Sequence, residues 1–380
     1  MHINKHKNDC CGCTACHYIC PHNAIEMKED ILGFKYPFVN EDICIDCGLC
    51  VKVCQFKKDY KTFDVSESQI FAFRNNDESQ LLRSQSGAAF WTIAQQFIRE
   101  GGIVYGCGFD DNHKVIHKRV TSIEELEDLR GSKYVQSDVC KTFKEAKEDL
   151  IRGKKVLYSG TSCQIANIKS FVGSRLRDNL FTIDLVCHGV PSPFIYRDYL
   201  ETLKKKNKNT LTRVNFRDKS KGWNMSIPSF RFGEKIHYST DYSRMFYSNL
   251  MLRESCYECP FTNFNRTADI SIADFWGWTK ISNKFNDNKG VSLLLVNSRK
   301  GFSLVDSVKD NCSLIPSDKK SCMQRNLNQP TKRNFLRSQF EEDYGKYGYD
   351  YVAIKYLEMG IKDTLVRNVK NVVKKIIGRK

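Results

Sequence analysis

The sequence predicts an α+β protein in which a small cysteine-rich N-terminal module precedes an α/β domain and a helical C-terminal tail. Three observations indicate this class. Two dense runs of cysteines fall within the first 57 residues. Helix and strand periods then alternate through the middle of the chain, and an amphipathic helical pattern ends it. A length of 380 residues is more than one compact core usually holds, so two or three domains are expected.

Composition indicates a globular chain from a reducing compartment. Hydrophobic residues make up 41% and aromatic residues 12% of the chain, which is enough to bury a core. No uninterrupted apolar run approaches the ~20 residues of a spanning helix. The N-terminus "MHINKHKND" has no apolar segment of the signal-peptide type, so a cytoplasmic location is expected. In such a compartment, 17 cysteines indicate metal ligation or catalysis rather than disulfides.

The first two cysteine runs repeat one spacing. "CCGCTACHYICP" contains CxxCxxCxxxCP, and "CIDCGLCVKVC" repeats it without the proline. This is the pattern of two-cluster bacterial ferredoxins, in which the fourth cysteine of each run ligates the other cluster. Structural zinc is the alternative for CxxC pairs, and Cys11, outside the pattern, is interpreted as a spectator thiol. The expected ligands are Cys10, Cys13, Cys16 and Cys54 for cluster one, and Cys44, Cys47, Cys50 and Cys20 for cluster two.

Local patterns predict the elements of the α/β part. "QFKKDYKTFDVSESQ" is typical of a polar linker. "SGAAFWTIAQQFIREGG" predicts a helix that ends at Gly101, and "GIVYGCGF" a strand after it. Ser122 with Glu125, and Thr142 with Glu145, have the spacing of capping boxes. "KKVLYSG" and "FTIDLVC" predict buried strands, with a helix starting near "CQIANIKSF" between them.

A third group of cysteines is scattered along the chain. Cys163 follows one predicted strand and Cys187 ends the next, so both lie at carboxyl ends, the edge where open α/β sheets bind ligands. Cys256 and Cys259 form a CxxC pair in "ESCYECPF" that would complete a set of four if its loop folds over this edge. The alternative is that Cys163 and Cys187 are small buried hydrophobes.

From about Ser84 to the middle 310s the chain resembles the beta subunit family of coenzyme F420 hydrogenases and dehydrogenases. The resemblance rests on "SQSGAAFWTIAQQFIREG", "LRGSKYVQSD", "VLYSGTSCQIANIKSF", "DLVCHGVPSP" and "CYECPFTNFNRTADISIADFWG". It implies an oxidoreductase with FAD on an α/β domain and a 4Fe-4S cluster. The ligands that it implies for this third cluster are the four cysteines already singled out: Cys163, Cys187, Cys256 and Cys259.

The same resemblance implies flavin contacts. This chain has Ala88 where the family usually has glycine, which alters the expected fit of the pyrophosphate, and it has Ala273 at a second position where glycine is more usual. Lys133 is expected to contact the flavin, and the alternative is an ordinary exposed lysine. Asp274 and Trp276 are expected to line the flavin or cluster pocket, and the alternative for both is core packing. The carried-over contacts are Ser86, Gly87, Lys133, Tyr134, Ser137 and Asp274.

The charge distribution indicates which kinds of partner the protein would attract. Residues 1–56 carry five lysines against seven acids, a net of −2, so the other residues carry +18 within the total of +16. A basic surface would attract an acidic ferredoxin or flavodoxin, or an anionic small-molecule substrate. Nucleic acid is not expected, because the basic residues are dispersed and no nucleic-acid-binding motif accompanies them.

The terminal segment "GIKDTLVRNVKNVVKKIIGRK" predicts a basic amphipathic helix. Seven cations, from Lys362 to Lys380, face the single acid Asp363. Such a helix is typical either of peripheral contact with the inner face of a membrane or of ordinary packing on the protein body.

Together these patterns predict five segments and two candidate functions. The segments are a two-cluster domain (1–57), a linker (58–82), the two parts of the beta-subunit-like domain (83–150 and 151–320, the second with the third cluster) and a basic helical tail (321–380). The first function is an oxidoreductase that passes electrons between one-electron carriers and a two-electron substrate, either the deazaflavin coenzyme or another small molecule. The second is a non-catalytic relay subunit of a larger redox complex.

Overall fold

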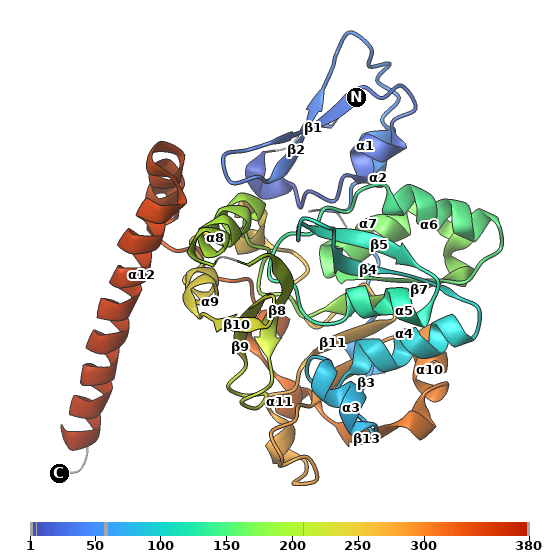
Figure 1. Ribbon diagram of the computed structural model, residues 1–380. Helices are drawn as coiled ribbons and strands as arrows, with labels where there is room; N and C mark the ends of the chain where they lie inside the picture. Colours follow the sequence, from blue (N-terminus) through green and yellow to red (C-terminus); the bar gives the residue numbers. More distant parts are fainter. Residues whose placement is uncertain (1–2, 5, 57–59, 208, 378–380) are drawn as a thin grey trace.

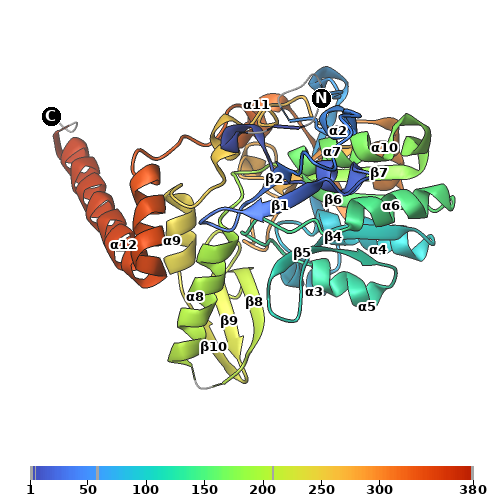
Figure 2. The ribbon, with the colours of Figure 1, turned by 90° about the horizontal axis from the view of Figure 1, so that it is seen from above.

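The computed structural model describes residues 3–4, 6–56, 60–207 and 209–377, with side chains placed up to residue 357. A small N-terminal domain lies on one face of a body built around an eight-stranded sheet (Figure 1). A three-stranded sheet and the C-terminal helix lie beside this body (Figure 2). The mixture of helices and strands confirms the predicted α+β class.

The N-terminal domain is a two-stranded hairpin with two short helices. Strands β1 (Ile25–Glu29) and β2 (Lys35–Val39) pair antiparallel. Helices α1 (Ala15–Ile19) and α2 (Leu49–Val53) contact each other, and each contains the third cysteine of its run. The residues that start them, Thr14 and Gly48, both have left-handed backbone conformations, which turn each cysteine run back on itself. This arrangement confirms the predicted ferredoxin-like domain.

The large sheet has the strand order β13-β3-β12-β11-β7-β6-β4-β5. Four consecutive strands, β11, β7, β6 and β4, run parallel, and the flanking strands pair antiparallel. The strands are β3 (Gln69–Asn75), β4 (Ile103–Phe109), β5 (Val115–Val120), β6 (Val156–Thr161), β7 (Leu180–Leu185), β11 (Ile270–Asp274), β12 (Ser292–Val296) and β13 (Cys312–Ser317).

Helices cover both faces of this sheet. Because successive strand residues point to opposite faces, Tyr105 and Tyr158 pack in one core and their neighbours Val104 and Leu157 in the other. The first core lies under α6 (Thr142–Ile151), α7 (Ser162–Val172) and the N-terminal domain. The second lies under α4 (Ala89–Arg99), α5 (Ile123–Leu126) and α10 (Arg299–Asp306). The remaining short helices are α3 (Glu78–Arg83) and α11 (Lys319–Cys322).

The three-stranded sheet packs with helices against the side of the body. Strands β8 (Leu211–Asp218), β9 (Ile227–Phe232) and β10 (Lys235–Tyr238) share an aromatic core with α8 (Pro193–Lys206) and α9 (Asp241–Tyr247). Helix α12 (Arg337–Ile377) adds its first turns to this core and is interrupted at Gly348. The side chains of the predicted basic tail, from Lys362 on, lie outside the described residues. Within the described residues, every helix is too short or too polar to cross a membrane.

Most predicted elements are confirmed, and one cap is wrong. The helix ending near Gly101 is α4, the following strand is β4, and the two buried strands are β6 and β7. The capping box of Ser122 and Glu125 is present. Thr142 is not a cap but the first residue inside α6, because its buried hydroxyl donates to Val139 O and contacts the Tyr158 hydroxyl, both at 2.7 Å.

The stretch expected as a linker, 58–82, contains all of β3 and all but the last residue of α3. Strand β3 lies between β12 and β13, so the chain enters the large sheet soon after leaving the N-terminal domain. Residues 321–380, expected as the tail, contain the last part of α11 and all of α12. The five segment boundaries remain predictions.

Candidate iron–sulfur and flavin sites

Two cavities in the N-terminal domain are each lined by one of the expected cysteine sets. Backbone amides point at ligand sulfurs in both: Gly12 N donates to Cys10 Sγ at 3.4 Å, and Ala24 N to Cys20 Sγ at 3.3 Å. Such hydrogen bonds tune iron–sulfur clusters. The first cavity is lined by Cys10, Cys13, Cys16 and Cys54, and the second by Cys20, Cys44, Cys47 and Cys50. In each cavity the fourth cysteine therefore comes from the other run.

A third cavity lies where the N-terminal domain meets the carboxyl edge of the large sheet. Strands β6 and β7 end side by side, with Thr161 opposite Leu185, and Cys163 and Cys187 each follow two residues later. The 3-10 helix Glu254–Glu258 carries Cys256 over this edge and ends at Cys259. All four cysteines line this cavity.

The four thiols of the third cavity lie close enough to interact electrostatically. Burial, and then the charge of Cys163, raises the pKa of Cys187 to about 12. Burial and neighbouring thiolates also raise the pKa of Cys256 and of Cys259. Four thiolates would repel one another here without a cationic centre, so the residues fit a 4Fe-4S cluster. Among the described residues, no three His, Cys, Asp or Glu side chains have the geometry of a single-ion site; in a cubane each thiolate binds a different iron.

Cys11 does not behave as an isolated thiol. It is buried and lines both the first and the third cavity. Asn167 of α7 donates to Cys11 Sγ at 3.7 Å and to Cys163 O at 2.7 Å. Sequence reasoning could not find this role, because Cys11 lies outside the repeated spacing.

A buried ion pair lies next to the strand ends that border the third cavity. Arg266 Nη2 lies 3.1 Å from Asp184 Oδ1, and both side chains are almost fully buried. The same guanidinium donates to Ser162 Oγ at 2.6 Å and to Leu185 O at 3.2 Å. Arg266 therefore joins the two strand ends that carry Cys163 and Cys187. Both partners lie inside quoted motifs, but sequence reasoning did not pair them, because nothing local shows that residues so far apart in the chain meet.

Two of the six expected flavin contacts lie together at the carboxyl end of β11, the strand next to β7. Ser86 Oγ donates to Asp274, which also pairs with Arg217 and accepts from Trp223 Nε1 at 3.2 Å. Lys219 lies beside them and donates to Ser86 O at 2.7 Å; burial lowers its pKa to about 7. Arg217 and Lys219 were not singled out from the sequence, because they lie on β8 and directly after it, outside the quoted motifs.

Gly87 packs tightly against the sheet. Its amide donates to Ser292 Oγ at 2.8 Å, and a Cβ there would stand 2.0 Å from Phe73 O. The next residue, Ala88, has φ +69, a conformation that favours glycine and accounts for the glycine usual at this position.

The other three expected flavin contacts each interact with a different part of the protein. Lys133 Nζ donates to the carbonyls of Asp128 and Arg130, both at 3.0 Å, and burial lowers its pKa to about 8. Tyr134 stacks on Phe246 with ring centroids 5.0 Å apart. Ser137 Oγ accepts from Gln164 Nε2 at 3.1 Å. No cavity found in the described part of the chain is lined by all six residues together.

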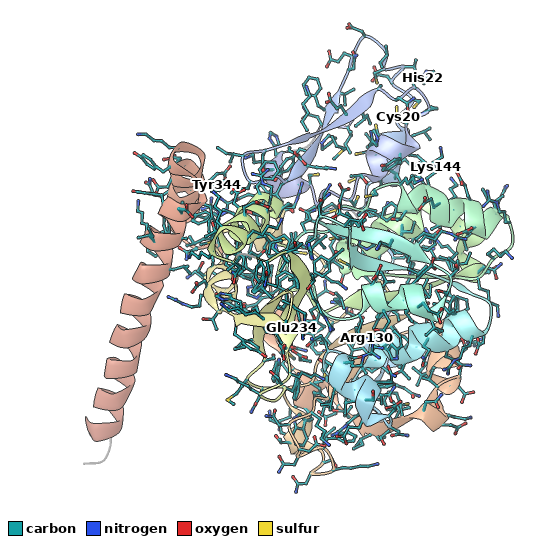
Figure 3. The ribbon with its side chains drawn as sticks, viewed as in Figure 1. Cys20, His22, Arg130, Lys144, Glu234 and Tyr344 are labelled. Atoms are coloured by element: carbon teal, nitrogen blue, oxygen red, sulfur yellow. The ribbon has the colours of Figure 1, made fainter. Side chains whose placement is uncertain are left out.

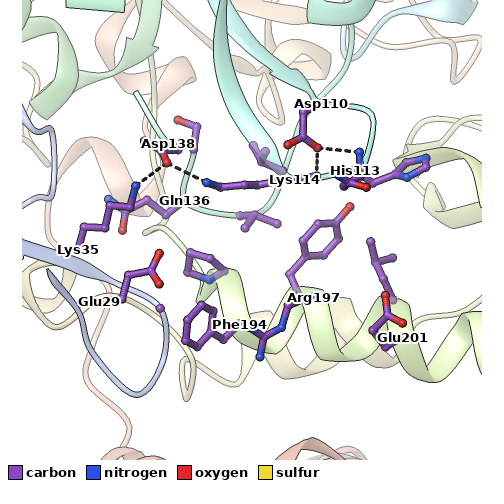
Figure 4. A pocket seen from close by; sticks show the side chains of 18 of the residues that line it. Glu29, Lys35, Asp110, His113, Lys114, Gln136, Asp138, Phe194, Arg197 and Glu201 are labelled. Atoms are coloured by element: carbon purple, nitrogen blue, oxygen red, sulfur yellow. Dashed lines mark hydrogen bonds and ion pairs between the residues drawn. The ribbon is translucent and has the colours of Figure 1, made fainter. Parts of the chain in front are cut away.

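A larger cavity of about 300 Å³ lies between the N-terminal domain and the body. Lys35 of β2 and Lys114 both donate to Asp138 Oδ2, at 2.6 and 2.9 Å (Figure 4). Phe194 and Arg197 of α8 form the opposite wall. Gly12, from the first cysteine run, also lines this cavity, so it offers space for a small molecule next to cluster one.

Comparison with known proteins finds family models that match two parts of the chain. Residues 153–320 match the family model that describes the C terminus of the coenzyme F420 hydrogenase/dehydrogenase beta subunit. Residues 9–58 match the 4Fe-4S dicluster domain. A solved chain from the F420-reducing [NiFe] hydrogenase complex of Methanosarcina barkeri is similar at 15% identity with a TM-score of 0.47, covering 79% of this chain and 93% of that one.

Curated relatives match short stretches of the chain. An uncharacterized ferredoxin of Methanocaldococcus jannaschii is 44% identical over 46 residues, which are 12% of this chain and 25% of that protein. Pyruvate synthase subunit PorD of Thermotoga maritima is 42% identical over 50 residues, 13% of this chain and 46% of that protein. The matches thus span less than half the length of these relatives. The chain therefore joins a region that matches a 4Fe-4S dicluster domain to a region that matches the C terminus of the coenzyme F420 hydrogenase/dehydrogenase beta subunit.

Proposed function

We propose that the protein is an oxidoreductase that passes electrons between ferredoxin-type carriers and a two-electron small molecule, through three 4Fe-4S clusters and FAD. One observation carries this proposal: three cavities are each lined by one of the three expected sets of four cysteines. Cys11 lies on both the first and the third, so these two sites are neighbours.

The exposure of the ligands supports an order of electron transfer. Cys47 of cluster two is exposed, and Ile45 beside it is 61% exposed. Cys20, another ligand of this cluster, lies on the part of the domain that projects from the body (Figure 3). An external ferredoxin or flavodoxin would therefore dock near cluster two, and electrons would pass through cluster one to the third cluster.

The substrate end of the route lies in the body. FAD, when bound, would accept single electrons from the third cluster and deliver them in pairs. Ser86 and Asp274, supported by Arg217 and Lys219, are proposed to hold it together with Gly87, Lys133, Tyr134 and Ser137. A small molecule of the deazaflavin type, or another two-electron acceptor, is the proposed substrate.

Iron analysis tests the cluster assignment. Three cubanes require about 12 iron atoms per chain, four in each. A Cys256→Ser/Cys259→Ser variant should lose roughly one third of the iron and keep the two N-terminal spectroscopic signals, because the ligand sets do not overlap. A Cys107→Ser variant is the matched control, since Cys107 lines none of the three cysteine cavities. Unchanged iron in the double variant would contradict the third cluster.

Flavin analysis tests the proposal that the protein binds FAD. The supernatant of acid-treated, anaerobically purified protein should contain FAD. An Asp274→Asn/Arg217→Gln variant should release it more readily while retaining its iron. Protein that binds no FAD even after reconstitution with excess FAD would contradict this part.

The second candidate function is a relay subunit without a substrate of its own. The large cavity beside Gly12 favours the enzyme, because a relay has no need of a chamber for a small molecule. A donor and acceptor screen distinguishes the two. An enzyme should turn over a small molecule with reduced ferredoxin alone, whereas a relay should turn over only when its partner enzyme is added.

Peripheral membrane contact through the basic terminal helix is also proposed. The backbone of α12 is helical up to Ile377, which supports the predicted helix. The full chain should co-sediment with anionic liposomes at low salt, and a chain that ends at Gly360 should keep its iron but stay in the supernatant. Equal partitioning of the two forms would contradict the membrane contact.

A further inference from the structure

Arg253 is a fully buried cation at the contact between the N-terminal domain and the body. Its side chain has 0% exposure. Nε donates to Cys10 O at 2.6 Å and Nη2 to Lys35 O at 2.9 Å, so one guanidinium binds two segments of the N-terminal domain. Nη1 donates to Gln136 Oε1 at 3.1 Å on the body.

This arginine differs from the other fully buried arginines in its lack of an acid. Arg266 has Asp184 at 3.1 Å, and Arg337 has Glu341 at 2.8 Å. Over the described residues, no carboxylate lies within ion-pair distance of Arg253, whose three side-chain acceptors are two carbonyls and an amide. Burying an unpaired charge costs several kcal/mol. A compensating negative charge is therefore expected nearby.

The cysteine sites on either side can supply that charge. Arg253 lines the third cavity and directly precedes the 3-10 helix that carries Cys256, whose amide donates to Arg253 O at 3.0 Å. On the other side its Nε reaches the carbonyl of Cys10, a ligand of cluster one. Four thiolates give a cubane site net negative charge, and that charge helps to set its reduction potential.

Neighbouring residues fix the position of the Arg253 guanidinium. Its centre lies 4.2 Å from the ring of Tyr36. Gln136 is fixed in turn, because its Nε2 donates to Cys11 O at 2.9 Å. At Gly12, with φ +68, a Cβ would stand 2.6 Å from Arg253 Nη1, so this residue leaves room for the arginine. A lysine has no planar fork and would make fewer of these contacts.

We propose that Arg253 is a positioning residue that holds cluster one against the third cluster and raises the reduction potentials of both. Its fixed positive charge stabilises the reduced form of each cluster, which carries one more electron than the oxidised form. Cluster two lies on the far side of the N-terminal domain and is little affected. This proposal rests on the three-cluster function proposed above.

The test is a redox titration of the full-length, anaerobically purified protein, followed by electron paramagnetic resonance. Arg253→Gln removes the charge. Gln136→Glu leaves the arginine in place but sets a carboxylate against it with nearly the same shape. Both variants should keep the wild-type iron content and make reduction of cluster one and the third cluster about tenfold less favourable, ~59 mV for a one-electron couple.

Two further variants separate charge from structure. Arg253→Lys should lower the melting temperature yet leave the potentials close to wild type, because the charge remains. Arg74→Gln is the matched control: Arg74 is largely buried and pairs with Asp287, and it lies on β3 away from the cysteine sites. It should leave all three potentials unchanged.

The test distinguishes failure of the proposed role of Arg253 from failure of the proposed three-cluster function. Wild-type protein with only two clusters would contradict the third cluster itself. Wild-type protein with three clusters, but unshifted potentials in Gln136→Glu or in a folded Arg253→Gln, would overturn the role of Arg253. An Arg253→Lys variant shifted as far as Arg253→Gln would also overturn it, since charge would then not be the cause.

Discussion

The two N-terminal cysteine sites and the third site reach similar ligand sets by opposite routes. In the N-terminal domain, three ligands of each site come from seven consecutive residues and only the fourth crosses over. In the body, the ligands come from the ends of β6 and β7 and from a loop about 70 residues beyond the second strand. Local turns hold the first two sites, whereas the third depends on the packing of the whole sheet. Damage to the body should therefore affect the third site first.

The largest expected effect comes from breaking the buried ion pair between Arg266 and Asp184, next to the third site. Asp184→Asn leaves Arg266 as an uncompensated buried charge, which costs about 3–5 kcal/mol of unfolding free energy. The variant should lose third-site iron while the N-terminal signals persist. Urea denaturation and iron analysis measure both effects.

Asp128→Asn is the control for this change. Asp128 pairs with Lys118 at the surface, where an ion pair contributes at most about 1 kcal/mol. Equal loss of iron from all three sites in Asp184→Asn would mean that the domain and the body unfold as one unit, which would break the comparison.

Gly12→Ala tests the junction between the two kinds of site. The left-handed backbone alone disfavours alanine by about 1–2 kcal/mol, and contact of its Cβ with Arg253 and with Gln136 Nε2 at 2.8 Å adds overpacking, for roughly 3 kcal/mol in all. Gly153→Ala is the matched control, because Gly153 has φ +76 but a Cβ there would have no atom within 4 Å. Similar melting temperatures for the two variants would show that the close approach at Gly12 is unimportant.

A smaller effect is expected at Asn167, which joins the domain to the body. Its Oδ1 accepts from Gln55 N at 3.0 Å, and its Nδ2 donates to Cys163 O. Asn167→Ala leaves these buried groups unpaired and should cost about 2 kcal/mol. Denaturant titration should place this loss above that of Cys11→Ala, which removes one small buried side chain and weak hydrogen bonds to sulfur. The reverse order would make Cys11 the more important group at this junction.

The smallest effect concerns acid pH at the domain contact. Burial alone would raise the pKa of Asp138, but hydrogen bonds from Lys35 and Lys114 lower it well below the ordinary value. The resulting stabilisation, about 1.5 kcal/mol, is fully present above the unfolded pKa of about 3.9 and is lost as pH falls below it. Asp138→Asn should therefore be less stable than wild type at pH 7, and this difference should shrink below pH 4. A difference independent of pH would exclude the carboxylate as its cause.

The sequence alone determined which cysteines share each N-terminal cavity, and it determined the main helices and strands of the body. The repeated CxxCxxCxxxC spacing acts within a few turns of chain, so it needs no tertiary information. The positions of Cys163 and Cys187 after two buried strands were sufficient to place them at one sheet edge, because parallel neighbours end on the same side. The capping box at Ser122 is likewise a local feature.

Only the tertiary structure decided which distant groups meet. Local spacing reveals no role for Arg253, Gln136 or Cys11, yet docking of the N-terminal domain brings them between two cysteine sites. Thr142 has the spacing of a cap but is buried, and its hydroxyl takes partners on the sheet side instead. Strand β3 lies in the segment 58–82 expected to be a linker, and its place between β12 and β13 comes from long-range pairing. Local spacing encodes local turns, whereas a buried charge or an inserted strand depends on chain segments far away in the sequence.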